Sequence, residues 1–191
     1  MYPLKFDELH SYAYGNDVFS PEECKTIIEL GHKFSLREGT VGGSIETDTI
    51  NIQKRKSKLS WIEPVKETVW LYNKLSQIVT NINEKHFKFD LHGFGEKIQF
   101  TQYEAPDSFY DYHVDRGFGI ATRKLSITVQ LTDPHEYEGG ELELHDGVFK
   151  YLPKNQGAVI AFPSYVLHKV NPVTRGVRHS LVTWVTGPQF K

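Results

Sequence analysis

Residues 124–131 read Lys-Leu-Ser-Ile-Thr-Val-Gln-Leu, with apolar and polar side chains in unbroken alternation. Successive side chains of a β-strand point to opposite faces of its sheet, so this pattern predicts a strand with one apolar and one polar face. We expect the apolar face to meet helices and the polar face to line a wet site inside a barrel. The segment therefore predicts a sheet with different surroundings on its two sides.

Short strand-like runs continue on both sides of this segment. Turn-forming pairs such as Asp133-Pro134, Gly139-Gly140 and Asp146-Gly147 separate them. Eight closely spaced runs favour a β-sandwich or a double-stranded jelly roll. The expected strands cover about residues 97–103, 109–115, 124–131, 140–144, 148–151, 157–162, 166–171 and 177–186.

Two amphipathic helices are predicted in the first half of the chain. Ser20, Pro21 and Glu23 suit the N-cap, the first helical position and the capping-box partner of the first helix. Its buried stripe is expected to consist of Cys24, Ile27, Ile28 and Gly31. A second helix is expected from about Pro64 to Lys85, with Val65, Val69, Tyr72, Leu75, Val79 and Ile82 on one face. The stretch from Gly39 to Ile50 is expected to be a flexible loop or a short hairpin.

These elements predict an α+β fold: a double-stranded β-helix (jelly roll, cupin-like) of about eight core strands, with N-terminal helices packed on one sheet. A length of 191 residues suits a single domain over 1–191. Within it we expect helical support and flanking strands over about 1–94, and the jelly-roll core over about 95–187.

The composition indicates which binding partners and which cellular location to expect. Hydrophobic residues make up 39% and charged residues 24%, and the formal net charge of −2 indicates no preference for nucleic acid or an anionic membrane. There is no apolar stretch of about 20 residues, and we expect no signal peptide. Cys24, the single cysteine, is expected to be buried and fits a reducing cytoplasm, so we expect a cytoplasmic protein. The oligomeric state stays open.

The segment His113-Val114-Asp115 is the first chemical signal. Residues two apart on a strand share a face, so both side chains can converge on one ion. His-x-Asp occurs by chance in many proteins, and a third ligand must come from far along the chain. His168, at the start of a later strand, is our candidate. Two imidazoles and one carboxylate on one side of a metal form the facial triad of Fe(II) oxygenases, which leaves positions open for a bidentate co-substrate and O₂.

Arg178 follows His168 by ten positions, on the last predicted strand. When 2-oxoglutarate chelates a metal, its second carboxylate lies about 5 Å away, where a planar guanidinium can bind it through two parallel hydrogen bonds. Ser180 shares the face of Arg178 and can contact the same carboxylate. Taken alone, Arg178 suits a solvated surface position equally well; the triad spacing favours the co-substrate role.

Four segments together resemble a known family: Phe100-Thr101-Gln102-Tyr103, His113-Val114-Asp115, Gly139-Gly140-Glu141-Leu142 and the run from His168 to Ser180. They are similar to the Fe(II)/2-oxoglutarate dioxygenases of the prolyl 4-hydroxylase type, above all to bacterial and phage PKHD-type hydroxylases. The resemblance covers roughly residues 95–187.

This resemblance implies a hydroxylase that uses Fe(II), 2-oxoglutarate and O₂, with ascorbate as a reductant. It places the iron on His113, Asp115 and His168, and the distal carboxylate of 2-oxoglutarate on Arg178. An intact Asp115 favours hydroxylation over the halogenation of relatives that lack this carboxylate. Further residues implied near the co-substrate or the inner pocket are Tyr103, Gln130 and Trp184.

The substrate is less defined. Arg116, which stands where relatives often have Asn, and Arg123 belong to a segment over 116–124 that we expect at the pocket entrance. Arg55, with Lys56 and Lys58, forms either a second cationic rim or an ordinary solvated face. A functional rim indicates an anionic or peptide substrate. Peptidyl proline is the default of the family, and small molecules stay open. The alternative to an oxygenase is a jelly roll that only binds metal or 2-oxoglutarate, as a sensor or an interaction module.

Overall fold

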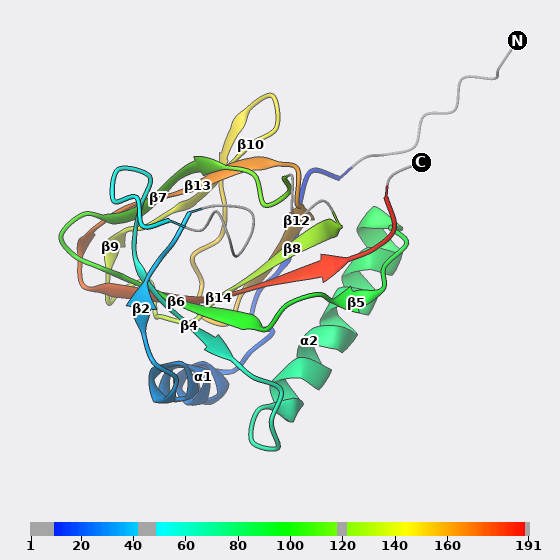
Figure 1. Ribbon diagram of the computed structural model, residues 1–191, viewed down its shortest axis with the longest axis horizontal. Coiled ribbons are helices and arrows are strands. Elements are labelled where there is room, and N and C mark those ends of the chain that lie inside the picture. Colours follow the sequence, from blue (N-terminus) through cyan, green and yellow to red (C-terminus); the bar gives the residue numbers. More distant parts are fainter. Residues whose placement is uncertain (1–9, 42–48, 118–121, 190–191) are drawn as a thin grey trace, which may run out of the picture.

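Two antiparallel sheets face each other, and two helices cover the outer side of the larger sheet (Figure 1). This computed structural model describes residues 10–41, 49–117 and 122–189. The arrangement is the jelly roll predicted from the strand pattern, with the helices on one sheet as expected. It leaves one surface of the larger sheet, the surface that faces the smaller sheet, free of helices.

The elements follow this layering. In spatial order, the eight-stranded sheet consists of β1 (Ala13–Gly15), β12 (Val159–Pro163), β8 (Arg123–Gln130), β14 (Val177–Thr186), β6 (Ile98–Glu104), β4 (Lys58–Ile62) and β2 (Arg37–Glu38), with β5 (Gly93–Phe94) beside β14. The six-stranded sheet consists of β11 (Phe149–Tyr151), β10 (Leu142–His145), β13 (Leu167–Arg175), β7 (Ser108–His113) and β3 (Arg55–Lys56), with β9 (Glu138–Gly139) beside β13. The helices are α1 (Pro21–Lys33), α2 (Val69–Ile82) and the π-helical turn η1 (Asn83–Phe87).

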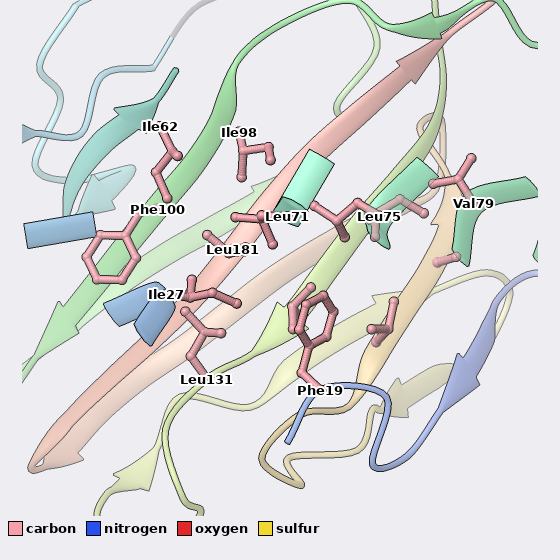
Figure 2. Close-up of a cluster of buried hydrophobic side chains, with 14 of the residues drawn as sticks. Phe19, Ile27, Ile62, Leu71, Leu75, Val79, Ile98, Phe100, Leu131 and Leu181 are labelled. Atoms are coloured by element: carbon pink, nitrogen blue, oxygen red, sulfur yellow. The ribbon is translucent and has the colours of Figure 1, made fainter. Parts of the chain in front are cut away.

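Strand β8 shows the predicted division between its two faces. Leu125, Ile127 and Val129 belong to the apolar core between the larger sheet and the helices. The alternate residues Ser126, Thr128 and Gln130 are buried too, but they lie on the side of the smaller sheet. Figure 2 shows the helix-side core, in which Phe19, Ile27, Ile62, Leu71, Leu75, Val79, Ile98, Phe100, Leu131 and Leu181 pack together.

Helix α1 begins as predicted. The backbone N–H of Glu23 donates to the Ser20 hydroxyl (3.2 Å) and the Ser20 N–H donates to the Glu23 carboxylate (2.8 Å), which completes the capping box. The buried stripe differs by one member, because Leu30 is buried where we expected Ile28, which is only partly covered. Gly31 lies against Phe100 of β6 so closely that a Cβ there would be 2.3 Å from the ring.

Helix α2 begins at Val69, five residues later than predicted. The Thr68 hydroxyl donates to the carbonyl of Glu63 and accepts from the N–H of Val65 (3.0 Å), so a side chain closes a turn where we expected the first helical turn. As a consequence Val65 and Val69 are exposed, and Leu71, Leu75 and Val79 are the buried residues. No helix within the described ranges is long and apolar enough to cross a membrane.

Strands also occur before residue 95, where the sequence indicated mainly helices. β4 pairs with β6 from Lys58↔Gln102 to Ile62↔Ile98 and so extends the larger sheet. In the expected loop or hairpin, a bridge joins Val41 and Thr49, and residues 42–48 lie outside the described ranges. Of the predicted strand at 140–144, only the part from Leu142 onward is a strand, β10, and the strand predicted at 166–171 continues to Arg175.

Candidate metal centre

Three side chains predicted as metal ligands meet between the two sheets. One ligand atom from each of His113, Asp115 and His168 lies within 4.8 Å of the other two. His113 Nε2 is 3.7 Å from one carboxylate oxygen of Asp115, and His168 Nε2 is 3.5 Å from the other. Among the described residues this is the one group of His, Cys, Asp or Glu with such a spacing.

The sheet pairing explains the convergence. His113 and His168 are direct neighbours across β7 and β13, so both imidazoles leave the same face. β7 ends at His113 and not at residue 115 as predicted. Asp115 follows the strand, and its N–H donates to the carbonyl of Ser164 (2.9 Å), which fixes the backbone that carries the carboxylate.

Both imidazoles are oriented by backbone carbonyls. Nδ1 of His113 lies 2.7 Å from the Asp111 oxygen, and Nδ1 of His168 lies 3.0 Å from the Val166 oxygen. A carbonyl oxygen only accepts, so each Nδ1 carries the proton and each Nε2 presents a lone pair to the centre. Burial and the neighbouring His168 hold the pKa of His113 well below its ordinary value, which keeps this imidazole neutral. Neutral imidazole is the form that binds metals.

Asp115 is held as a buried anion. Burial alone would raise its pKa, but the two histidines, the Ser126 hydroxyl and the Trp184 indole lower the pKa below the ordinary value. The Ser126 hydroxyl donates to Oδ2 of Asp115 (2.7 Å) and lies 3.0 Å from the hydroxyl of Ser164. Two imidazole nitrogens and one buried carboxylate are the donor set of a facial-triad Fe(II) site. The residues present therefore fit this metal.

A β-bulge in β7 brings one more ring to the site. Between the pairs His168↔His113 and Val170↔Tyr110, β7 has one residue more than β13, which turns Tyr110 to the face of His113. The two rings are stacked, with centroids 3.5 Å apart and planes at 17°. The guanidinium of Arg55 lies 4.6 Å from the centroid of the Tyr110 ring.

The inner face of the larger sheet supplies a second group of polar residues. Arg178 of β14 is paired with Tyr103 of β6, and Ser180 is paired with Thr101 on one side and Gln130 on the other. All five side chains are buried. Tyr103 lies close enough to Tyr110 to contribute to the raised pKa of the Tyr110 hydroxyl. The guanidinium of Arg178 lies 5.3 Å from the Tyr103 ring centroid. The predicted co-substrate residues thus share one interior with the three ligands.

Arg178 is a buried cation without an anion. It is 1% exposed, and none of the ion pairs among the described residues includes it. One of its N–H groups donates to the amide oxygen of Gln130 (2.9 Å), another is 3.5 Å from the Ser180 hydroxyl, and Nε has no partner. Because a buried charge is costly unless it is paired, this geometry indicates a binding site for an anion.

Trp184 lies at the metal end of β14. It is paired with Ser126 across the sheet. Its buried indole N–H makes no close hydrogen bond, but it is near enough to Asp115 to help lower the pKa of that carboxyl. The guanidinium of Arg123 lies over the indole, 3.8 Å from the ring. Arg123 also donates to both carboxylate oxygens of Glu96 (2.6 and 2.5 Å) and to the carbonyl of Asp115 (3.2 Å). The charge of Arg123 is therefore neutralised by Glu96, and its side chain is held by these contacts, so it is not a free cation at the pocket entrance.

The predicted cationic rim does not form as a unit. Arg55 turns inward and is 6% exposed, with Nε donating to Ser57 (2.8 Å) and Nη2 unpartnered. Lys56 and Lys58 are exposed and contact the Pro106 carbonyl and Glu104. Arg116 is half-buried beside Lys124. Of the segment 116–124, residues 118–121 lie outside the described ranges.

Several residues of the site were not predicted from the sequence. Ser126 could have been predicted, since it lies on the polar face of the alternating segment 124–131. Ser164, Tyr110 and Glu96 carried no signal, because their roles depend on a loop, a bulge and a contact between distant segments.

Comparisons with known proteins point in one direction. Residues 98–186 match the 2OG-Fe(II) oxygenase superfamily. The chain is 34% identical over 182 residues to a PKHD-type hydroxylase of Synechococcus sp., covering 88% of this chain and 75% of that protein. It is 29% identical over 174 residues to a PKHD-type hydroxylase of Nitrosomonas europaea, covering 85% and 73%.

Solved structures show the same fold. A Pseudomonas putida prolyl-4-hydroxylase superposes with a TM-score of 0.72 and 23% identity, covering 94% of both chains. A prolyl hydroxylase of Trichoplax adhaerens, solved with a peptide fragment of hypoxia inducible factor, superposes with a TM-score of 0.75 and 16% identity, covering 92% of this chain and 83% of that one.

Proposed function

The chain belongs to the PKHD-type hydroxylases of the 2OG-Fe(II) oxygenase superfamily, and on this premise we propose that the site between the two sheets is where it binds iron, co-substrate and a peptide substrate. As a member it is an Fe(II)- and 2-oxoglutarate-dependent hydroxylase. When bound, the metal and co-substrate supply the oxidising chemistry, in which 2-oxoglutarate is converted to succinate and CO₂ and one oxygen atom enters a C–H bond.

His113, Asp115 and His168 would hold the metal. The backbone carbonyls of Asp111 and Val166 fix the two imidazoles, and Ser126 fixes the carboxylate. These contacts hold the ligand atoms in place before the ion arrives, which is the usual role of hydrogen bonds around a metal site.

Arg178 would bind the distal carboxylate of 2-oxoglutarate, and its burial without an anion is the observation that carries the proposal. A carboxylate would neutralise the guanidinium and accept from the unpartnered Nε–H. Gln130 and Ser180 support this role by contacting the two terminal nitrogens and holding the plane of the guanidinium. Tyr103, directly across the sheet, forms a wall of the same pocket.

For the substrate we propose a peptide, with a prolyl residue as the first candidate. Support comes from the resemblance in fold to prolyl hydroxylases, one of them solved with a peptide fragment. Trp184 and Arg123 form a rigid stacked pair next to Asp115, suited to pack against an aliphatic ring. Arg55, with one unpartnered guanidinium nitrogen, is the remaining candidate for a polar contact to the peptide.

The first test is turnover of the co-substrate. Purified protein with Fe(II), 2-oxoglutarate and O₂ should form succinate slowly by itself and faster when a library of proline-containing peptides includes a substrate, detected by a mass increase of one oxygen atom. His168→Ala should form none, whereas His135→Ala, a change at an exposed histidine, should behave as wild type. Binding of 2-oxoglutarate without any succinate would favour a sensor over an oxygenase.

A further inference from the structure

Tyr137 lies beside Arg178, at one end of the interior between the two sheets. It was not among the site residues predicted from the sequence. It follows the turn Asp133–Glu136 and directly precedes β9, and its side chain is 2% exposed. A Cβ added at Gly140 would lie 2.9 Å from Cδ of Arg178 and 3.4 Å from Cε2 of Tyr137. The arginine stem and the tyrosine ring therefore border the same point, and the glycine has no side chain to separate them.

The Tyr137 hydroxyl is buried and has no hydrogen-bond partner. Arg178 beside it carries only donors, so it can approach the phenol oxygen but cannot accept the phenol proton. Nε of Arg178 is likewise a buried donor without a partner. The phenol oxygen can accept a hydrogen bond from Arg178, but the phenol proton is left without an acceptor, which is unfavourable for a buried group. A group with more than one acceptor oxygen would satisfy both the phenol and the Nε–H of Arg178.

The surroundings keep this phenol in place and protonated. The ammonium of Lys154 lies 4.4 Å from the centroid of the Tyr137 ring, and Lys154 is itself fixed by the Gly139 carbonyl (2.7 Å) and by Glu141 (3.3 Å). Burial raises the pKa of Tyr137 above its ordinary value, although the charge of Arg178 opposes this. At neutral pH the side chain is therefore a fixed O–H donor.

We propose that Tyr137 donates a hydrogen bond to the distal carboxylate of 2-oxoglutarate, next to Arg178; this inference rests on the function proposed above. A carboxylate offers two oxygens and about four acceptor positions, enough for Nε–H, a terminal N–H and the phenol. Gln130 does not compete for this role, because its amide oxygen accepts from Arg178 and its amide nitrogen faces the Pro153 carbonyl (3.4 Å). Gln130 orients the arginine, and Tyr137 completes the carboxylate site.

The test compares two ligands that differ only at the distal end. 2-Oxovalerate keeps the 2-oxo acid and the chain length of 2-oxoglutarate but ends in a methyl group. Binding of both is measured by calorimetry, without oxygen, to the full chain loaded with Zn(II), which has no redox chemistry. The variants are Tyr137→Phe, which removes only the hydroxyl, and Tyr151→Phe at an exposed tyrosine as the matched control.

Tyr137→Phe should weaken 2-oxoglutarate binding about 10- to 100-fold, the usual effect of losing a hydrogen bond to a charged group. Its affinity for 2-oxovalerate should stay within about twofold of wild type, and Tyr151→Phe should change neither. An unchanged affinity for 2-oxoglutarate would overturn the inference. Equal weakening of both ligands would overturn it too, since it would make Tyr137 a structural residue. If wild type binds neither ligand, the proposed function itself fails, which is a separate result.

A double-mutant cycle adds a readout that a structural role would not produce. If Tyr137 and Arg178 hold the same carboxylate, the losses of Tyr137→Phe and Arg178→Ala for 2-oxoglutarate should not add, because removing the arginine displaces the carboxylate from the phenol. Strictly additive losses would assign the two residues to separate contacts and contradict the shared site.

Discussion

The Tyr110 ring lies parallel to the imidazole of His113, with centroids 3.5 Å apart, and so covers one face of a candidate iron ligand. Such a contact restricts rotation of the imidazole, and aromatic pairs contribute about 0.5–1.5 kcal/mol beyond their burial. Tyr110→Ala should therefore weaken metal binding by up to about tenfold, while Tyr110→Phe should leave it unchanged. Calorimetric titration with Zn(II) measures this; a loss in the Phe variant equal to that in the Ala variant would assign the effect to the hydroxyl instead.

Ser126→Ala should weaken metal binding as well, for a different reason. Its hydroxyl donates to the Asp115 carboxylate over 2.7 Å, and loss of such supporting contacts typically costs 10- to 100-fold in metal affinity. Ser76→Ala, at an exposed position of α2, is the control and should bind as wild type. Competition with a metal chelator of known affinity gives the numbers.

Arg178→Ala should weaken binding of the co-substrate and leave metal binding unchanged. Removing one partner of a buried charge-assisted pair costs about 2–5 kcal/mol, so the apparent KM for 2-oxoglutarate should rise at least about thirtyfold. The affinity for metal should stay within about twofold. Arg175→Ala, which removes an exposed arginine that lies three residues before Arg178 and is paired with Glu138, should alter neither. If both affinities fall in parallel in Arg178→Ala, the residue is structural.

The residues of the site differ in how far their positions could be predicted from the sequence. The polar face of β8 was visible as alternation, so Ser126 and Gln130 were predictable as lining residues. The triad was predictable from spacing together with a known resemblance. Tyr110 was not, because strict alternation puts it on the opposite face from His113, and only the bulge in β7 reverses this. Tyr137 reaches the site from a loop, and no periodicity specifies where a loop places its side chain.

The errors in the helical half have a similar origin. The helical periodicity predicted that α2 begins at Pro64. Instead, the Thr68 hydroxyl bonds to the Glu63 carbonyl and the Val65 N–H, and a turn forms there. The buried stripe of α1 was nearly right because its N-terminal cap is encoded within four residues. Local signals of this kind were reliable, whereas competition between a side chain and the backbone was not visible in the pattern.

Stability should depend on pH through His179. This residue stacks on Phe100 outside the site, and burial, with the charges of His32 and Arg178, lowers its pKa from 6.5 to about 4. Between these values the unfolded chain binds a proton that the folded chain does not, so the free energy of unfolding should fall as the pH falls through this window, by about 3 kcal/mol in all. Below about pH 4 the contribution is lost completely.

Urea unfolding at pH 7 and at pH 4.5 checks this. His179→Gln should show a smaller loss of stability than wild type over that interval, and His135→Gln, at an exposed histidine, should show the wild-type loss. An identical pH dependence in all three proteins would mean that His179 does not titrate differently on folding.

The contact between Gly31 and Phe100 predicts a stability effect far from the site. A methyl group on Gly31 would lie 2.3 Å from the Phe100 ring, so Gly31→Ala must displace a buried aromatic side chain. Overpacking typically costs about 1–3 kcal/mol, and better helix propensity returns about 1 kcal/mol of it. We expect a lower melting temperature than for Gly117→Ala, where an added Cβ meets nothing within 4 Å. Equal melting temperatures would show that Phe100 has room to move.

The two-faced strand β8 also limits how this protein can diversify. Its even-numbered residues from Ser126 to Gln130 face the reactive interior, and the odd-numbered ones from Leu125 to Leu131 face the helices. A substitution changes one side chain on one face and leaves the other face intact. An insertion or deletion of a single residue exchanges the two faces beyond it, so aliphatic chains enter the pocket and hydroxyls enter the core. Point changes in β8 can therefore alter substrate preference without disturbing the core, whereas we expect insertions and deletions to be tolerated only in the connecting loops.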